Sequence, residues 1–204
     1  MQRTIPTFPH GTSVVGHLES LTILIATTGR PTLARTLDSI RGQLAPPDEV
    51  VCVCGSPTTD ARKLWDAAAL PGRFIELPSR GGDWGHTERN HVLASGLIHT
   101  SHVHHLDDDD TLAPGAGVAI RKAIRSEPKR IHIFRMLFAG RPIPEEGRPI
   151  EVGNVGTPCI VHPAAAPRGL FAPAYGGDGA FIVATCAANG GYVLHEDVIV
   201  RVRE

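Results

Sequence analysis

The chain has 204 residues, of which 42% are hydrophobic and 20% are charged. This length fits one domain of ordinary size or two small ones. Its 20 Lys and Arg side chains face 21 Asp and Glu side chains, so the formal net charge is -1. Overall charge therefore gives no general attraction to nucleic acid or to an anionic membrane, although the composition still allows a local basic groove.

The four cysteines form no Cys-x-x-Cys pair and are spaced neither as a zinc site nor as a disulfide framework. We expect reduced, buried thiols, which are typical of cytoplasmic proteins. Residues 1–17 lack the long apolar core of a signal peptide. No stretch approaches the 18 apolar residues that a membrane span requires. The sequence thus predicts a cytoplasmic protein.

Residues 1–20 contain scattered Pro and Gly and are expected to form an N-terminal arm. Beyond the arm, continuous β-branched apolar runs predict strands, and apolar residues at helical spacing predict helices. In chain order the pattern predicts a strand over 21–27, a helix over 33–44, a strand over 49–54, a helix over 60–70, a strand over 74–77, a helix over 87–98, a strand over 103–106, a helix over 112–125, a strand over 131–138, a turn-rich excursion over 142–149, a strand over 157–161, a helix over 178–189, and strands over 192–195 and 198–202.

Strands alternate with helices through the first two-thirds of the chain, which favours an α/β fold with a mainly parallel sheet. Hairpin-like spacing in the last third predicts some antiparallel strands near the C-terminus. In such sheets ligands bind beyond the carboxyl ends of the strands. We expect four segments to meet at that edge, namely 27–30, 54–60, 80–86 and 107–110.

The run Asp107-Asp-Asp-Asp110 directly follows an apolar strand. Four adjacent carboxylates repel one another and are costly to hold together without a cation. Asp107 and Asp109 would point the same way if strand geometry continued, and their oxygens suit Mg²⁺ or Mn²⁺ with substrate phosphates completing the shell. The alternative is a solvated turn in which Asp110 or Thr111 caps the next helix.

Other polar residues are less specific signals of a functional site than the acidic run. His102 and His104 would share one strand face, which can form a metal site, but partly buried imidazoles without a metal are the favoured interpretation. His195 is followed by Glu196-Asp197 and could return to the edge where the acidic run lies. Asp178, in a glycine-rich loop at a helix start, is either a general base or a helix cap.

Five segments, in this order, resemble the family 2 glycosyltransferases of the GT-A fold. The resemblance covers about 21–203 and is most specific at His105-Leu-Asp-Asp-Asp-Asp-Thr-Leu-Ala-Pro-Gly115, which is similar to the DxD segment of the family. The other segments are Leu21 to Pro31, Pro47 to Val53, Gly81-Gly82 with Glu88-Arg89-Asn90, and Gly176 to Phe181.

The resemblance implies a Rossmann-like three-layer GT-A sandwich that moves a single sugar, with inversion, from a nucleotide-sugar donor to an acceptor hydroxyl. It implies that Asp109 binds Mn²⁺ or Mg²⁺ directly, while Asp107 contacts the ribose or the metal shell. It also implies that Asp178 is the general base and that His195 completes the metal shell. The remaining donor-binding residues would be Thr27, Arg30, Arg89 and Asp108.

Some features depart from the family pattern. Its Asp after the second strand is missing, and Asp60 is the nearest carboxylate, so the donor base stays open. The acceptor also stays open among a sugar, a lipid carrier, a protein and a modified nucleic-acid base, and a homo-oligomer is allowed. Two alternatives remain: a nucleotidyltransferase acting on sugar phosphates, and a catalytically inactive nucleotide-sugar-binding relative.

We expect residues 21–204 to form one minimal GT-A catalytic domain. Residues 21–110 would be its nucleotide-sugar-binding half, and residues 111–204 its acceptor and catalytic half.

Overall fold

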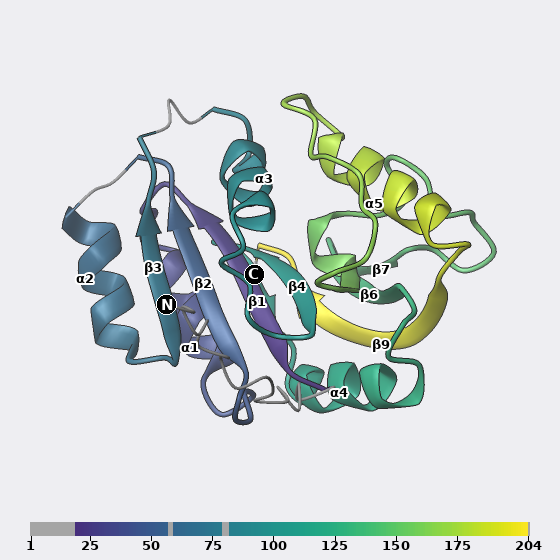
Figure 1. Ribbon diagram of the computed structural model, residues 1–204, viewed down its shortest axis with the longest axis horizontal. Coiled ribbons are helices and arrows are strands. Elements are labelled where there is room, and N and C mark those ends of the chain that lie inside the picture. The colour runs from purple at the N-terminus through teal and green to yellow at the C-terminus, as the bar shows by residue number, and fades with distance from the viewer. Residues whose placement is uncertain (1–18, 57–58, 79–81, 204) are drawn as a thin grey trace, which may run out of the picture.

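The computed structural model describes residues 19–56, 59–78 and 82–203, so the expected arm lies almost wholly outside the described residues. Within these ranges nine strands form one sheet in the order β3-β2-β1-β4-β8-β6-β9-β5, with β7 paired to β6 (Figure 1). The strands are β1 (Leu21–Thr27), β2 (Glu49–Cys54), β3 (Gly72–Glu76), β4 (His102–Asp107), β5 (Thr111–Leu112), β6 (His132–Phe138), β7 (Arg141–Ile143), β8 (Ile160–Pro163) and β9 (Val193–Arg201).

Helices cover both faces of this sheet. They are α1 (Leu33–Ile40), α2 (Thr59–Ala68), α3 (His86–Ala94), α4 (Ala116–Ser126) and α5 (Gly177–Ala188), together with the 3₁₀ turn η1 (Thr157–Cys159). Strand β1 is buried along its whole length. Its Ile23 packs in one cluster with Leu37 of α1, while its Leu24 packs in another cluster with Val92 of α3. A strand covered on both faces can be continuously apolar, which is why β1 shows no alternation.

The predicted α/β architecture is confirmed. Strands β1 to β4 pair in parallel, and β8, β7 and β5 add antiparallel pairs. The order β3-β2-β1-β4 places a topological switch point between β1 and β4, where a crevice forms beyond the strand ends. The register sets Ala26 opposite Asp107 and Thr27 opposite Cys54, so these carboxyl ends lie side by side.

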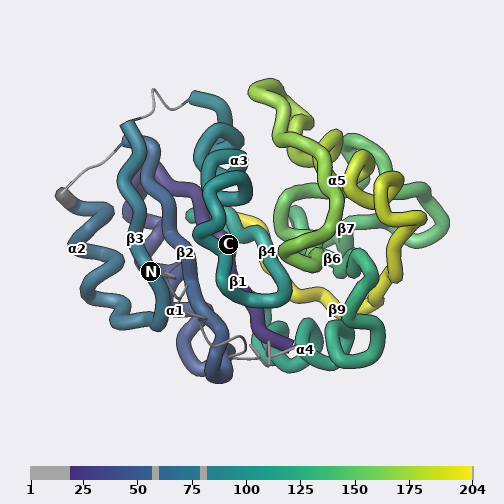
Figure 2. Tube along the Cα trace, viewed as in Figure 1, coloured from purple at the N-terminus to yellow at the C-terminus, as the bar shows by residue number. Residues whose placement is uncertain are grey.

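The end of the chain differs from the prediction. The two strands expected over 192–195 and 198–202 are one strand, β9, which runs parallel to β6 rather than forming a hairpin (Figure 2). The pairing passes from Ile133 opposite Leu194 to Arg135 opposite Val198, so β9 carries extra residues at a bulge. The polar Glu196-Asp197 pair sits in that bulge.

The predicted bounds of three other elements differ from the observed ones. The helix expected over 112–125 begins only at Ala116, because Thr111–Leu112 pairs with β9 as β5. The expected turn-rich excursion begins with strand β7, which pairs with β6. The strand expected over 157–161 is divided between η1 and β8.

All four cysteines are buried and unpaired, as expected. Burial raises the pKa of the Cys159 thiol to about 12 and that of Cys186 to about 11, so both are protonated at neutral pH. Among the described residues, no helix combines the length and the apolar character that a membrane crossing requires.

Histidines form part of the core between β4 and β8. His104 and His162 are fully buried, and burial lowers the pKa of each to about 4. The Nε2 atoms of His105 and His162 lie 3.1 Å apart. Such a contact is a hydrogen bond only when one nitrogen carries the proton and the other accepts it, so at least one of the two rings must be neutral.

We therefore expect the free energy of unfolding to fall as pH falls from about 6.5 to about 4. In that window the unfolded chain protonates these histidines and the folded chain does not, and each histidine costs up to about 3 kcal/mol. Urea unfolding across this window measures the slope. His104→Gln should flatten it, while His91→Gln, at an exposed position, should not. Equal slopes for both variants would contradict the expectation.

Candidate functional site

The acidic run forms a tight turn at the carboxyl end of β4. The strand ends at Asp107, and the N–H of Asp110 donates to the carbonyl of Asp107 at 3.2 Å. The strand geometry therefore does not continue to Asp109. The turn instead sorts the four carboxylates by exposure: Asp108 and Asp110 are 2% exposed, whereas the side chains of Asp107 and Asp109 are 34% and 13% exposed.

The two buried carboxylates hold other parts of the site in place. The Thr27 hydroxyl donates to Asp108 at 2.6 Å, and the Arg30 guanidinium pairs with the same carboxylate. Asp110 accepts the backbone N–H of Arg203 at 3.1 Å. Asp110 does not cap the following helix, because α4 starts after Gly115. Thr27 and Arg30 thus reach the acidic run as expected, but Asp108 is occupied in holding them.

The partly exposed Asp109 lies between two guanidinium groups. Its Oδ2 is 3.0 Å from Arg30 Nη1 and 3.3 Å from Arg203 Nε. A third arginine, Arg35 of α1, donates to the backbone carbonyl of Asp109 at 3.1 Å. The open side of the turn is therefore surrounded by cationic side chains that suit a phosphate group.

Asp107 is paired with Arg89 of α3. This arginine is 1% exposed, and its Nη1 also donates to the carbonyl of Trp84 at 2.8 Å. Gly85 makes the approach of α3 possible: its φ is +77°, and an added Cβ would lie 2.5 Å from the Cβ of Ala26. Only glycine lets the start of α3 sit this close to the carboxyl end of β1.

Asp178 lies in the first turn of α5, but it does not cap that helix. Gly176, with φ of +78°, is the N-cap residue. The Asp178 Oδ2 atom instead accepts the backbone N–H of Thr157 at 3.2 Å, with the Thr157 hydroxyl at 3.5 Å. The alternative of a helix cap is therefore wrong, and the carboxylate is directed toward η1.

The carboxylates of this region outnumber the cations that pair with them. Asp107 to Asp110 and Asp178 are five acidic groups, and Arg30, Arg89 and Arg203 are three guanidiniums in contact with them. Burial raises the pKa of Asp107 against the lowering effect of Arg89, and the charges of Asp109 and Asp178 raise it further. Burial, with the charges of Asp107 and Asp109, raises the pKa of Asp110 to about 8.

Asp107 and Asp109 are the partly exposed carboxylates of the turn, and their hard oxygens are suitable ligands for a divalent cation. In the part of the chain that the structure describes, no three His, Cys, Asp or Glu side chains gather closely enough to hold a metal ion. Asp107 and Asp109 could therefore supply only part of the ligand shell of a cation.

His195 is not brought to the acidic run. Its Nε2 lies 3.0 Å from Nδ1 of His132, and its ring stacks on Phe134 with centroids 4.4 Å apart. It stands near the start of β9, whereas β9 pairs with β5, beside the acidic turn, at Val200 and Arg201. Because β9 is one continuous strand, Arg203 rather than His195 lies beside Asp109.

Two further expectations are resolved by the structure. His102 and His104 are buried, and each faces a backbone carbonyl, of Pro128 and Ile160 respectively. Asp60 lies on α2, where its exposed carboxylate pairs with Lys63 at 3.5 Å. Of the glycine-rich loop, residues 80 and 81 lie outside the described residues.

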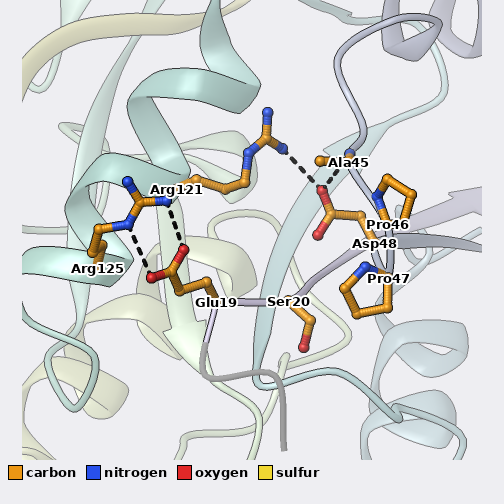
Figure 3. Close-up of a pocket in the computed structure, with 8 residues that line it drawn as sticks. All are labelled: Glu19, Ser20, Ala45, Pro46, Pro47, Asp48, Arg121 and Arg125. Atoms are coloured by element: carbon orange, nitrogen blue, oxygen red, sulfur yellow. Dashed lines mark hydrogen bonds and ion pairs between the residues drawn. The ribbon is translucent and has the colours of Figure 1, made fainter.

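A surface pocket of about 340 Å³ lies at the opposite end of the sheet, beside the residues that precede β1 and β2 (Figure 3). Its acidic side chains are already paired: Asp48 with Arg121 at 2.9 Å, and Glu19 with Arg125 at 2.7 Å. The pocket is thus separate from the acidic run and offers no unpaired carboxylate to a ligand.

Sequence reasoning missed Arg203 and Arg35. Arg203 follows the last strand and belongs to no motif. It reaches Asp109 only because β9 pairs with β5. Arg35 lies in the amphipathic pattern of α1 at an exposed position, where a charged residue is ordinary. Neither residue carries a local signal that separates it from surface arginines.

No protein-family model matches the chain, and no curated protein matches it in sequence. Solved structures match it in fold. TarS residues 1–349 from S. aureus superpose with a TM-score of 0.70 at 15% identity, over 90% of this chain and 60% of that one. The same protein in complex with UDP-GlcNAc superposes with a TM-score of 0.72 at 16% identity, over 91% of this chain and 58% of that one.

The mannosyltransferase PcManGT from Pyrobaculum calidifontis, in complex with GDP-Man and Mn²⁺, gives a TM-score of 0.64 at 14% identity, over 90% of this chain and 56% of that one. The chain therefore spans about 60% of the length of these structures. The likeness shows that it has the GT-A glycosyltransferase fold.

Proposed function

We propose that this protein is a metal-dependent glycosyltransferase that moves one sugar from a nucleotide-sugar donor to an acceptor hydroxyl. The observation that carries the proposal is the acidic turn at the switch point between β1 and β4, where three arginines pair with two partly exposed carboxylates and a fourth, Arg35, donates to the Asp109 carbonyl. The solved structures of this fold support it, since one is a complex with UDP-GlcNAc and another a complex with GDP-Man and Mn²⁺.

In this proposal Arg30, Arg35 and Arg203 bind the donor diphosphate. Arg30 is about half exposed, and the buried Asp108 orients its guanidinium. Asp109, with Asp107, would hold Mn²⁺ or Mg²⁺ together with the diphosphate. The cation supplies positive charge that stabilises the nucleoside diphosphate as it leaves. Thr27 and Arg89 maintain the shape of the turn by holding Asp108 and Asp107.

Asp178 is proposed as the general base. It accepts the proton of the acceptor hydroxyl while the hydroxyl oxygen forms a bond to the anomeric carbon of the sugar. The bond from that carbon to the diphosphate oxygen breaks, and its electron pair leaves with the nucleoside diphosphate. Attack from the side opposite the leaving group inverts the anomeric carbon. The Thr157 N–H, 3.2 Å from Asp178 Oδ2, orients the carboxylate.

Asp109→Asn tests the donor site. The variant keeps the size of the side chain but loses a charged oxygen ligand, so Mn²⁺-dependent binding of UDP or GDP should weaken roughly tenfold or more. Calorimetry with and without Mn²⁺ measures the change. The matched control is Asp60→Asn, which neutralises an exposed carboxylate on α2. Unchanged binding by the Asp109 variant would exclude a metal role for this residue.

Asp178→Asn tests the chemical step. Without a proton acceptor, the transfer rate should fall on the order of 10²–10⁴-fold, while the affinity for nucleoside diphosphate and Mn²⁺ should stay unchanged. The assay follows release of nucleoside diphosphate from UDP-, GDP- and dTDP-sugars. Full activity in the variant would remove Asp178 as the base. Release of pyrophosphate from a nucleoside triphosphate plus a sugar phosphate, by the unaltered protein, would replace the proposal with a nucleotidyltransferase.

A further inference from the structure

Two large aromatic side chains are exposed beside the proposed active site. Trp84 is 59% exposed and Tyr175 is 93% exposed. Their ring centroids lie 6.4 Å apart, with an angle of 71° between the ring planes. They come from segments far apart in sequence, just before α3 and just before α5, whose starts lie at the same end of the molecule (Figure 1).

The backbone beneath this pair is closely packed. The Nδ1 atom of His86 lies 2.5 Å from the carbonyl of Ala172, and the His86 ring stacks on Phe171 with centroids 5.5 Å apart. An added Cβ on Gly177 would lie 2.1 Å from the Ala172 carbonyl and 2.9 Å from His86 Cε1. The segments that carry Trp84 and Tyr175 are therefore packed against each other. This packing holds the two rings at defined positions.

The pair is also tied to the residues of the proposed reaction. The carbonyl of Trp84 accepts a hydrogen bond from Arg89, and Arg89 pairs with Asp107. Tyr175 precedes the proposed base, Asp178, by less than one helical turn of chain. A molecule resting on these rings would have one end close to the carboxylate that is proposed to deprotonate an acceptor.

We propose that Trp84 and Tyr175 form an acceptor subsite that stacks the pyranose ring of a carbohydrate acceptor, an inference that rests on the proposed function. A pyranose has apolar C–H faces that pack against aromatic rings and a rim of hydroxyls that needs hydrogen-bond acceptors. Two rings set at 71° offer such faces on two sides. The carboxylate of Asp178 lies close in sequence to Tyr175 and can accept a hydrogen bond from a sugar hydroxyl.

Charge favours a sugar over a nucleic acid at this position. The phosphates of a polynucleotide would lie near the negative charges of Asp83 and Asp178, whereas a neutral sugar meets no such repulsion. The proposal therefore narrows the acceptor to a glycan or a glycoside with a free hydroxyl.

The chain allows a direct spectroscopic test, because it has only two tryptophans and two tyrosines. Trp65 is 8% exposed and packs on Phe74, so Trp65→Phe leaves Trp84 as the only indole. In that variant, methyl pyranosides and disaccharides are titrated in the presence of Mn²⁺ and UDP or GDP. We expect a saturable change in Trp84 emission at millimolar sugar. Tyr175→Ala, added to this variant, should weaken the apparent affinity roughly five- to tenfold.

Tyr192→Ala is the matched control, since Tyr192 is the other tyrosine, is 36% exposed, and lies next to the start of β9. It should leave the sugar titration unchanged. In the transfer assay, Trp84→Ala and Tyr175→Ala should raise the KM for the sugar acceptor several-fold and leave nucleoside diphosphate binding unchanged.

The outcomes separate this inference from the proposed function. If nucleoside diphosphate and Mn²⁺ bind but no pyranoside changes the Trp84 emission, the acceptor subsite is wrong and the donor site stands. If neither nucleotide nor sugar binds, the proposed function itself fails. An emission change produced by phosphatidylcholine vesicles, or by self-association of the chain, and by no sugar would also overturn the subsite.

Discussion

The central physical constraint in this protein is the repulsion among carboxylates gathered at the carboxyl ends of β1 and β4. Asp107 to Asp110 lie there, the charge of Asp178 also acts on Asp107, and three arginines from three different segments pair with the run. Each arginine is carried by a separate part of the fold: the turn after β1, helix α3, and the residues after β9. The acidic turn is therefore held by three parts of the fold that are far apart in sequence.

The closely spaced carboxylates affect both the stability of the folded protein and the proposed binding of a cation with a diphosphate. Burial and neighbouring carboxylates raise the pKa of Asp107 and of Asp110, so the unliganded site holds its charges at a cost. A cation bound together with a diphosphate would lower that cost, and the arginines would then also face phosphate oxygens. Under the proposed function, the same arrangement would favour a ligand that carries both metal and phosphate.

Much of the site could be predicted because its signals are local. Thr27 and Asp107 each end an apolar run, so their places at one sheet edge follow from parallel pairing. Arg89 is implied by the family resemblance of Gly81-Gly82 with Glu88-Arg89-Asn90. The different roles of Asp108 and Asp109 could not be predicted in this way. Both residues belong to one uniform acidic run, and only the turn after β4 buries one and leaves the other partly open.

The sequence by itself determined the alternation of buried strands and helices, the α/β class and the position of the acidic run at a strand end, because hydrophobic periodicity and turn residues act over short distances. The tertiary structure alone decided which distant residues complete the site. Strand β9 pairs in parallel with β6, and this sends His195 toward His132 and brings Arg203 to Asp109. Strand partners are chosen by packing across the whole sheet, and no local pattern in 192–203 records that choice.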